Sequence, residues 1–491
     1  MKRKAKEALK DQFADKIAFD KATRMLYSRD VGVLPRLVSL AIKPVPDAVF
    51  LPRDEKEIVD LFRIANQYKI PVIPRGAGTS GYGGALAYRG GIMVDLTAIT
   101  EVEEISAEDM TVTAGAGITF SNLEAILSSK NQALRSYPSS APSATLGGWF
   151  AQGGSGIGDL LYGSFRDQVL SVRLIRPDGE IIELRGNAIS QHYELEGITG
   201  IITRLSLKTR KATPIKPILG SFQSIDQLMN AMDTLLEILT PFAINIETPT
   251  FIRLRQQATG EVLLSEDNYY ALLAIEELNK NSESVVAESI ENQGGNIEDT
   301  EKATYEWKER FFPLRLKRLG PGIILGESYI PNDRLRVYIE AIEKKFRRDE
   351  PSVEAHIISK KEAAVLIYFC DDDRRLTAMF ALSKILQIMN LATKLGGRPY
   401  STGLWLSGKK REFFGVERLK EIKKLKKTSD PSGIANPGKI LGGKVRILPF
   451  VPISMALRIA APFMKIGNTI FRYRRSKTFP PPSRHGREIR G

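Results

Sequence analysis

Apolar residues recur along this chain with two different periods, and the change of period predicts strands and helices in turn. The segment from Lys43 to Phe50 predicts a strand, and a second strand ends at the loop that begins with Pro74. Between them, apolar residues return every three or four positions from Asp54 to Tyr68, which predicts an amphipathic helix. Gly90–Leu96 and Thr111–Thr119 predict two more strands, followed by another helix. The first part of the chain is therefore expected to run strand, helix, strand, loop, strand, strand, helix.

A second domain is expected beyond Lys208–Pro217, where two prolines favour an extended connection. Strand-like segments there are L-G-S-F (219–222), Y-Y-A-L-L-A-I-E (269–276) and A-V-L-I-Y-F-C (364–370), and helix-like segments span 225–239, 282–293, 331–347 and 374–395. This alternation predicts an antiparallel sheet covered by helices, an α+β arrangement. The expected boundaries are 1–213 for the first domain, with a core of about 44–210, 214–443 for the second, and 444–491 for a tail.

Two glycine-rich tracts interrupt this pattern in the first domain. They read P-R-G-A-G-T-S-G-Y-G-G from Pro74 to Gly84 and S-A-T-L-G-G-W-F-A-Q-G-G-S-G from Ser143 to Gly156. Glycine adopts left-handed turns that let successive backbone amides point one way, toward a polyanion. The chain has no G-x-x-x-x-G-K-[ST] loop, and these glycines do not form a G-x-G-x-x-G turn that opens a helix. Two such tracts suit a pyrophosphate gripped from both sides.

Five separated motifs extend this pattern over most of the chain. They are Tyr27–Asp30, Leu161–Asp167, Pro177–Glu180, Gly197–Thr203 and Asp430–Lys439. With the two tracts and the order of elements, the chain resembles the vanillyl-alcohol oxidase and p-cresol methylhydroxylase superfamily. Within it, the resemblance is to the branch that contains the glycolate oxidase flavin subunit, D-lactate dehydrogenases and alkylglycerone-phosphate synthase. The resemblance implies a two-part FAD-binding domain followed by an α+β cap domain that returns to the flavin at its C-terminal end.

The resemblance implies FAD as the cofactor, and it also implies which residues bind FAD. The residues expected to contact the pyrophosphate and ribose are Pro74, Arg75, Gly76, Ala77, Gly78, Thr79, Ser80, Gly81, Ser143, Thr145, Gly147, Gly148, Gly154, Ser155 and Gly156. The backbone of Gly197, Gly200, Ile201 and Ile202 is expected to line the adenine side. Asn436 and Lys439 are expected to close on the flavin from the C-terminal end. Members that tether FAD covalently use a histidine in the first loop or a cysteine in the second. Here the first loop has Ala77, Gly78 and Thr79, and the sole thiol is Cys370. We therefore expect noncovalent FAD.

The cap domain keeps only part of the hydroxy-acid pattern of these relatives. Trp307-Lys308-Glu309-Arg310 matches their Trp-x-x-Arg element and places Arg310 where a substrate carboxylate would be held, a task that suits a guanidinium fork. The metal-histidine segment keeps His356 but has Ala363 at the second position. One histidine cannot supply the three or four ligands that a divalent metal needs, so no metal is expected.

Two side chains remain candidates for proton transfer. His356 is either a hydrogen-bonded structural histidine or an active-site group. Tyr400, in the stretch where relatives carry Glu-His-Gly, is either a proton carrier or part of the pocket wall. A tyrosine carries protons only where a cation or hydrogen bonds lower its pKa from about 10.

These features predict an FAD-dependent dehydrogenase that oxidises a small anionic alcohol, such as a 2-hydroxy acid, by hydride transfer to flavin N5 and passes electrons to a partner protein or quinone. One alternative is a redox-neutral flavin-dependent transferase resembling alkylglycerone-phosphate synthase. A second alternative is a flavin subunit that docks onto an iron–sulfur partner. Bleaching of the flavin by substrate distinguishes the dehydrogenase hypothesis from the transferase, because only the dehydrogenase accumulates reduced flavin without an acceptor.

Composition adds the cellular setting. At 491 residues and 43% hydrophobic, the chain is long enough for two cores, and a single cysteine excludes a disulfide framework and fits a reducing compartment. The charged N-terminus lacks the apolar run of a signal peptide, so a cytoplasmic protein is expected, peripheral at the inner face of the cytoplasmic membrane if the tail binds there. No nucleic-acid recognition motif is present, and no nucleic acid is expected as a partner.

The tail is the most basic part of the chain. Residues 444–491 carry eleven Lys and Arg and one acidic residue, Glu488, and so hold ten of the fourteen net positive charges. Six apolar residues of the tail share one helical face: Met455, Ile459, Pro462, Phe463, Ile466 and Ile470. Three basic residues lie along the edge of that face: Arg458, Lys465 and Arg472. The tail is expected to bind a membrane surface, dock onto a partner subunit or pack on the body of the protein. The basic residues interrupt the apolar runs, so it is too short to span a bilayer.

Overall fold

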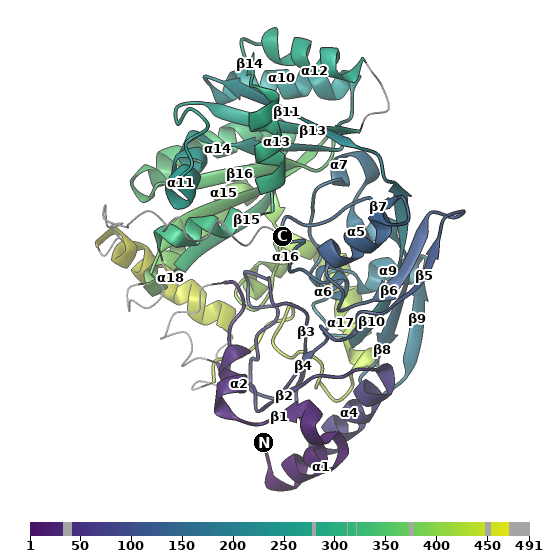
Figure 1. The fold of residues 1–491 in the computed structure, drawn as a ribbon. Coiled ribbons are helices and arrows are strands. Elements are labelled where there is room, and N and C mark those ends of the chain that lie inside the picture. Colours follow the sequence, from purple (N-terminus) through teal and green to yellow (C-terminus); the bar gives the residue numbers. More distant parts are fainter. Residues whose placement is uncertain are drawn as a thin grey trace. The chain divides into compact units, whose positions relative to one another are not determined.

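The computed structural model forms two compact units (Figure 1). It describes residues 1–32, 42–276, 281–311, 313–320, 322–372, 378–446 and 453–470. The first unit takes residues 1–155, 164–212 and 399–460, and the second takes 156–163, 213–398 and the chain from 461 onward. The chain thus leaves the first unit after Ala212 and returns to it at Pro399.

A small, mainly parallel sheet opens the first unit. Its strands follow the order β1-β2-β4-β3, with β1 antiparallel to β2 and β4 parallel to both β2 and β3: β1 (Ile17–Ala18), β2 (Ala48–Phe50), β3 (Val72–Arg75) and β4 (Ile92–Asp95). Helix α4 (Glu55–Tyr68) makes the crossover that two parallel strands require. The Asp54 carboxylate caps it by accepting from Glu57 N at 2.9 Å, and Lys69 ends it in a left-handed conformation. The strand–helix–strand order read from the periodicity is confirmed.

A six-stranded antiparallel sheet forms the rest of the core of the first unit. Its long strand β10 (Ile201–Lys211) pairs with β6, β7 and β8. The other strands are β5 (Val102–Ser106), β6 (Thr111–Gly115), β7 (Gln132–Leu134), β8 (Val169–Ile175) and β9 (Ile181–Arg185). The predicted strand over Thr111–Thr119 stops at Gly115, because Gly115 N turns to Glu101 O and Gly117 N to Ile99 O. Periodicity missed β5, whose burial is too slight for a clear pattern.

Helices connect the strands of the first unit. They are α1 (Arg3–Phe13), α2 (Lys21–Leu26), α5 (Phe120–Ser128), α6 (Leu146–Gln152), α8 (Phe165–Gln168), α9 (Asn187–His192), α16 (Lys410–Phe414) and α17 (Val416–Ser429). The apolar faces of α1 and α4 pack with the small sheet in one core that includes Leu9, Phe50 and Phe62. Ile434, from the returning C-terminal segment, belongs to the same core, and Val72 N donates to its carbonyl at 2.8 Å. The C-terminal segment is therefore part of the first unit's packing.

An eight-stranded sheet builds the second unit. Its order is β14-β11-β13-β12-β16-β17-β15-β18, and the pairs from β14 through β15 are antiparallel. The strands are β11 (Ile215–Phe222), β12 (Ala243–Glu247), β13 (Tyr269–Glu276), β14 (Asn296–Ile297), β15 (Gly322–Pro331), β16 (Ser352–Ile357), β17 (Glu362–Asp371) and β18 (Arg398–Pro399). The expected α+β cap with an antiparallel sheet is confirmed.

Helices lie against this sheet on both faces. On one face, α11 and α13 pack on β11 and β13 through Ile252, Ala303 and Leu272. On the other, Gly220 meets Ile290 of α12, and Gly326 meets Ile388 of α15. The helices are α7 (Asp159–Tyr162), α10 (Ile225–Ile238), α11 (Pro249–Thr259), α12 (Ser282–Glu291), α13 (Thr300–Glu309), α14 (Asn332–Phe346) and α15 (Ala378–Lys394), and α18 (Ile453–Ile470) begins in the first unit's range and ends in the second's. The predicted helix at 374–395 starts partly outside the described residues.

The connection expected over Lys208–Pro217 is shorter than predicted. β10 continues to Lys211, and β11 already begins at Ile215. Pro217 lies inside β11, opposite Ala274 of β13, while the neighbour on the other side, β14, pairs only with Gly220 and Ser221. Among the described strands none pairs with Pro217 on that side, and a proline without an N–H is tolerated at such a position.

Candidate functional site

The first glycine-rich tract leaves the end of β3 and folds around an arginine. The Arg75 Nη1 donates to Ala85 O at 3.3 Å, and its guanidinium lies over the ring of Tyr27. Gly78 has φ +72°, and a Cβ there would overlap the Arg75 guanidinium. The Arg75 side chain therefore fills the inside of the loop, and the loop presents its backbone.

The second tract meets the first one directly. Thr145 caps α6 by accepting from Gly148 N at 3.3 Å, and a Cβ on Gly76 would overlap the Thr145 hydroxyl. Gly147 N donates to Ala116 O at 2.8 Å, where a Cβ on Gly147 would come within 2.6 Å of the Ala116 side chain. The structure thus brings together two tracts that lie about seventy residues apart in the sequence, and they can be this close because they lack side chains.

Tyr400 holds the turn that follows α6. Its hydroxyl accepts from Ser155 N at 2.9 Å and donates to Ser155 O at 3.2 Å, and a Cβ on Gly154 would overlap it. Tyr193 donates to the Gly154 carbonyl at 3.3 Å. A tyrosine hydroxyl has a single proton, and that of Tyr400 is donated to Ser155, so proton transfer by Tyr400 would have to break this bond. Gly156 is the first residue of the second unit, where its N donates to Asp159 Oδ2 at 2.9 Å.

Asn436 ties three segments of the first unit together. Its side-chain amide donates to Glu196 O at 2.5 Å and to Gly84 O at 3.3 Å, and its backbone N donates to Val72 O at 2.8 Å. Gly197, with φ +71°, sits where a Cβ would overlap the ring of Pro74. Gly200, at the start of β10, likewise sits where a Cβ would overlap Ile175 O. Of the expected adenine-side residues, Gly197 therefore lies beside the first tract, whereas Gly200 lies beside β8.

A group of buried charges lies at the far end of the first tract, and sequence reasoning missed two of its members. Lys439 Nζ donates to Leu86 O at 2.7 Å, the Glu196 carboxylate accepts from Gly403 N at 2.7 Å, and Asp30 accepts from Gly83 N at 2.8 Å. Burial raises the pKa of Asp30 to about 6 and that of Glu196 to about 7, and burial lowers the pKa of Lys439 to about 8.

The attraction of Lys439 for both carboxylates opposes these shifts. Asp30 and Lys439 therefore hold the loop over 83–86 through hydrogen bonds to its backbone, and Glu196 holds the neighbouring loop at Gly403. Asp30 was within a recognised motif, but nothing in the sequence marked Glu196 beyond its place directly before Gly197.

The fit of this region to FAD rests on its shape. Gly76 packs against the Thr145 hydroxyl and Gly147 packs against Ala116, so a Cβ at either position would overlap the neighbouring segment. Two backbone segments that approach this closely without side chains suit a polyanion such as a pyrophosphate. Within the two tracts no histidine or cysteine is present, and Cys370 lies on β17 of the second unit. The residues present fit the cofactor, and the two tracts contain no imidazole or thiol for a covalent tether.

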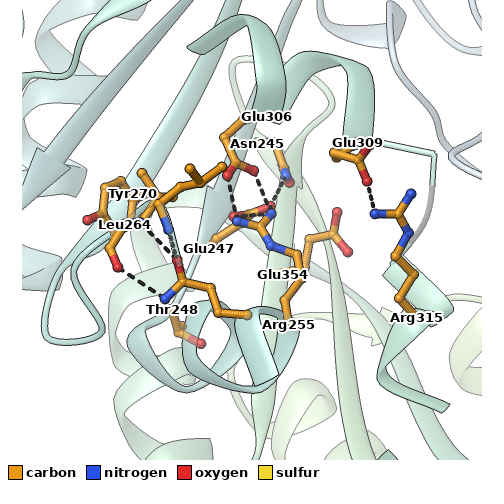
Figure 2. Close-up of polar contacts among 12 residues, drawn as sticks. Asn245, Glu247, Thr248, Arg255, Leu264, Tyr270, Glu306, Glu309, Arg315 and Glu354 are labelled. Atoms are coloured by element: carbon orange, nitrogen blue, oxygen red, sulfur yellow. Dashed lines mark hydrogen bonds and ion pairs between the residues drawn. The ribbon is translucent and has the colours of Figure 1, made fainter. Parts of the chain in front are cut away.

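The second unit carries a polar cluster on one face of its sheet (Figure 2). Arg255 of α11 is paired with two carboxylates: its Nη1 lies 3.1 Å from Glu247 Oε2 on β12, and its Nη2 donates to Glu306 Oε1 on α13 at 2.8 Å. All three side chains are buried or nearly so. Burial raises the pKa of Glu247 to about 8; Arg255 opposes this rise, and Glu306 and Glu354 add to it. The cluster thus holds more carboxylates than its single guanidinium can balance.

His356 joins the same face through Glu354. The antiparallel register pairs Asn245 with His356 and Glu247 with Glu354, so these four side chains lie on one face. His356 Nε2 lies 3.3 Å from Glu354 Oε1, and Tyr368 donates to Glu354 Oε2 at 3.0 Å. The pKa of Glu354 is lowered mainly by His356, which overcomes the effect of its burial. The strand sequences A-I-N-I-E and S-V-E-A-H-I, with polar residues at alternate positions, were the signal that could have revealed this cluster.

Ala363 does not share a face with His356. It pairs with Ile357, whereas His356 pairs with Ala364. Across the residues that the structure describes, no three His, Cys, Asp or Glu side chains are grouped to hold a metal ion. That the protein is metal-free stays a prediction, which elemental analysis of the purified holoprotein checks.

Arg310 ends α13 and stacks on aromatic rings. Its guanidinium carbon lies 3.8 Å from the centre of the Trp307 ring and 4.0 Å from that of Phe311, and it donates to Trp307 O. Glu309, next to it, pairs with Arg315 (Figure 2). Cation–π stacking on both rings and the hydrogen bond to Trp307 O hold the side chain in place.

The fold and the two tracts define a flavoprotein with an FAD-binding unit and a cap unit. Residues 46–185 match the family described as FAD binding domain, and residues 214–440 match the one described as FAD linked oxidases, C-terminal domain. The chain belongs to the FAD-linked oxidase family, and it is an FAD-linked oxidoreductase. The resemblance stated from the sequence is thereby confirmed.

Similar proteins include hydroxy-acid enzymes. The chain is 26% identical over 463 residues to the glycolate oxidase subunit GlcD of Bacillus subtilis (strain 168), which covers 87% of this chain and 94% of the relative. It is 25% identical over 425 residues to the mitochondrial D-lactate dehydrogenase [cytochrome] of Arabidopsis thaliana, with 81% and 74% covered. The solved structure of p-cresol methylhydroxylase with substrate bound matches with a TM-score of 0.75 at 14% identity, covering 89% of this chain and 96% of that one, and shows the shared fold.

Proposed function

We propose that this protein is an FAD-dependent dehydrogenase that oxidises a small anionic alcohol of the 2-hydroxy-acid class. The observation that carries the proposal is the meeting of the two glycine tracts at Gly76 and Thr145, which supports a pyrophosphate site there. The similarity to a D-lactate dehydrogenase and to a glycolate oxidase subunit, over more than 80% of the chain, supports the substrate class.

FAD is held without a covalent bond in this proposal. Pro74 to Gly81 would surround the pyrophosphate from one side, and Ser143 to Gly148 with Gly154 to Gly156 from the other. Gly197 to Ile202 would face the adenine, and Asn436 and Lys439 would close the site. The lack of a histidine or cysteine in either tract supports noncovalent binding.

Bound FAD would supply the acceptor of the hydride, at its N5 atom. The chain's own share is to bind and orient the substrate and to take the hydroxyl proton. We assign the carboxylate contact to Arg310, whose planar guanidinium can give two parallel hydrogen bonds. We assign the proton to the imidazole of His356, which the Glu354 carboxylate would orient and stabilise once protonated. Tyr368 and its hydrogen bond to Glu354 would keep that carboxylate in place.

The electrons would leave through a partner protein or a quinone. The relative from Bacillus subtilis is described as a subunit, which supports a partner for this chain, and an iron–sulfur protein would suit one-electron transfer. With a single cysteine, this chain cannot itself hold a cluster ligated by four thiolates. We place the protein in the cytoplasm.

The test is an anaerobic screen of 2-hydroxy acids and sugar acids that follows the absorbance of the bound flavin. A substrate of the proposed class should bleach the flavin without any added acceptor, because the hydride has nowhere else to go. Full flavin content with no bleaching by any acid in the screen would refute the dehydrogenase proposal. Turnover without bleaching, with an alkylglycerone-phosphate type of substrate, would favour the redox-neutral transferase instead.

A further inference from the structure

Helix α18 (Ile453–Ile470) has one face packed on the protein and one face exposed. On the packed face, Ala456 contacts the cluster of Ile42, Tyr88, Leu404 and Val445 in the first unit. Further along, Met464 is 3% exposed, and in the second unit Gly467 lies against the ring of Phe380, where a Cβ would come within 2.7 Å. The helix therefore presents a definite side to the outside.

That outer side carries a stripe of large apolar side chains. They are between 52% and 71% exposed, and we call them the α18 stripe: Met455, Ile459, Phe463, Ile466 and Ile470. Their spacing of four, four, three and four residues places them on one line along the helix. The other large exposed apolar residues of the described chain are scattered singly or in pairs, as is ordinary for a protein surface. A continuous exposed stripe is instead typical of an interaction site.

The positive charge on and after α18 indicates the kind of surface that would cover the stripe. Helix α18 contains no acidic residue, and Lys465 beside the stripe is exposed. The sequence after it, from Arg472 to Arg490, adds seven basic residues and one acidic residue. An apolar stripe with a strongly basic flank matches a bilayer interface with anionic headgroups, where each basic residue adds attraction. A protein partner with an apolar groove would require no such excess of positive charge.

The geometry favours lying in the interface over crossing the bilayer. Pro462 sits inside α18 and removes one helical hydrogen bond, and the opposite face is already packed on the protein. Among the described helices, none is long and apolar enough to span a membrane. We propose that the α18 stripe inserts into the surface of an anionic phospholipid bilayer, with Lys465 beside it at the level of the headgroups. Arg472 and the residues after it lie outside the described part of the chain and enter here by their charge alone.

This inference goes beyond the proposed reaction and does not depend on its substrate. Flotation of the holoprotein with vesicles of phosphatidylcholine, with or without phosphatidylglycerol, tests it. The protein should float with the vesicles that contain phosphatidylglycerol at low salt, remain at the bottom with pure phosphatidylcholine, and lose binding as the salt concentration rises. Failure to float with phosphatidylglycerol vesicles at low salt would overturn the proposal.

Variants assign the binding to the stripe. Ile459→Ser with Phe463→Ser should reduce vesicle binding at least tenfold while the flavin content and melting temperature stay unchanged, because both side chains are exposed. The matched control is Val262→Ser with Leu26→Ser, two exposed apolar residues away from α18, and it should bind as the unaltered protein does. Equal binding by the stripe variant would exclude the stripe. Light scattering that shows a dimer in the unaltered protein and a monomer in the stripe variant, without vesicle binding, would show that a second copy covers the stripe.

Discussion

At the scale of single residues, the two units place charges in interiors where each charge depends on its partner. In the second unit, Arg255 lies between Glu247 and Glu306, and in the first, Lys439 is buried near Asp30 and Glu196. A buried charge is tolerated only when paired and hydrogen-bonded. These residues are therefore expected to be sensitive to pH and to substitution by neutral side chains.

Arg310 tests the carboxylate contact. Arg310→Lys keeps the charge but loses the planar pair of donors and should cost about 1.5–3 kcal/mol of substrate binding in the transition state. The rate of anaerobic flavin reduction should fall roughly tenfold to a hundredfold, with the flavin content unchanged. Lys308→Arg, exposed on the same helix, is the control and should reduce flavin normally. An unaltered rate in Arg310→Lys would remove Arg310 from the site.

Glu247 gives a prediction on pH. Its ordinary pKa of 4.5 is raised to about 8 in the folded protein, so between these values the folded protein holds a proton that the unfolded chain has released. Stability is therefore lost as the pH rises through this window, by at most about 1.4 kcal/mol per pH unit for one proton. Glu247→Gln cannot release that proton, and its melting temperature should fall less between pH 5 and pH 8 than that of the unaltered protein.

Calorimetry of the holoprotein at several pH values in that range checks the difference. Glu288→Gln, exposed on α12, is the matched control and should follow the unaltered protein. Parallel pH profiles for Glu247→Gln and the unaltered protein would contradict the idea that Glu247 holds a proton.

At the scale of elements, the site depends on segments that approach one another without side chains. The loop after β3 and the start of α6 meet at Gly76 and Thr145, and the loop over 401–405 packs on the first tract, where Leu404 N donates to Tyr82 O at 2.9 Å. A Cβ on Gly403 would overlap that same carbonyl. The glycines of these loops are thus required by close packing as well as by backbone conformation.

Gly76→Ala tests this close approach. The new methyl group would overlap the Thr145 hydroxyl, and relieving that overlap should cost about 1–3 kcal/mol and weaken FAD binding by roughly tenfold or more. In Gly76→Ala with Thr145→Ala, the hydroxyl and methyl of Thr145 are gone, so part of the affinity should return. Fluorescence titration of the apoprotein with FAD measures both. Equal FAD affinity in Gly76→Ala and the unaltered protein, or no recovery of FAD affinity in the double variant, would show that the two tracts do not form one FAD-binding site.

At the scale of the whole molecule, the chain is an FAD-linked oxidase built from two units, with the cofactor expected on residues of the first. The fold continues past residue 212 into a separate sheet and then returns from Pro399, so the first unit is complete only when the C-terminal segment has packed. Asn436 and Ile434 are the contacts that close it. We therefore expect truncation before residue 430 to abolish cofactor binding.

Cofactor content is the direct measurement at this scale. One FAD per chain should appear in the supernatant after acid precipitation, because neither tract contains a histidine or cysteine for a covalent bond. Absorbance of the supernatant, with the protein concentration from amino-acid analysis, gives the ratio. Yellow colour that stays with the denatured pellet would show a covalent tether and contradict the prediction.

The sequence by itself determined the features that depend on local chemistry. Short stretches of sequence were enough to predict three features: the apolar period of α4 with its Asp54 cap, the α+β order of the second domain, and the two glycine tracts. They could be predicted because helix capping, strand alternation and glycine turns act between near neighbours in the sequence. The motifs in their order also identified the family. Many strands were missed because their polar positions or continuous burial obscured the period, among them β5, β8, β9, β10, β12, β15 and β16.

Only the tertiary structure decided which side chains meet. Tyr400 binds Ser155, which is 245 residues away, and Glu196 lies by Gly403, 207 residues away, so no local pattern could relate them. The Arg255 cluster arises because two antiparallel strands set Glu247 opposite Glu354 while α11 and α13 add an arginine and a third carboxylate. The sequence placed the apolar residues of α18 on one face, but burial is a property of the whole fold, and only the structure left that face exposed.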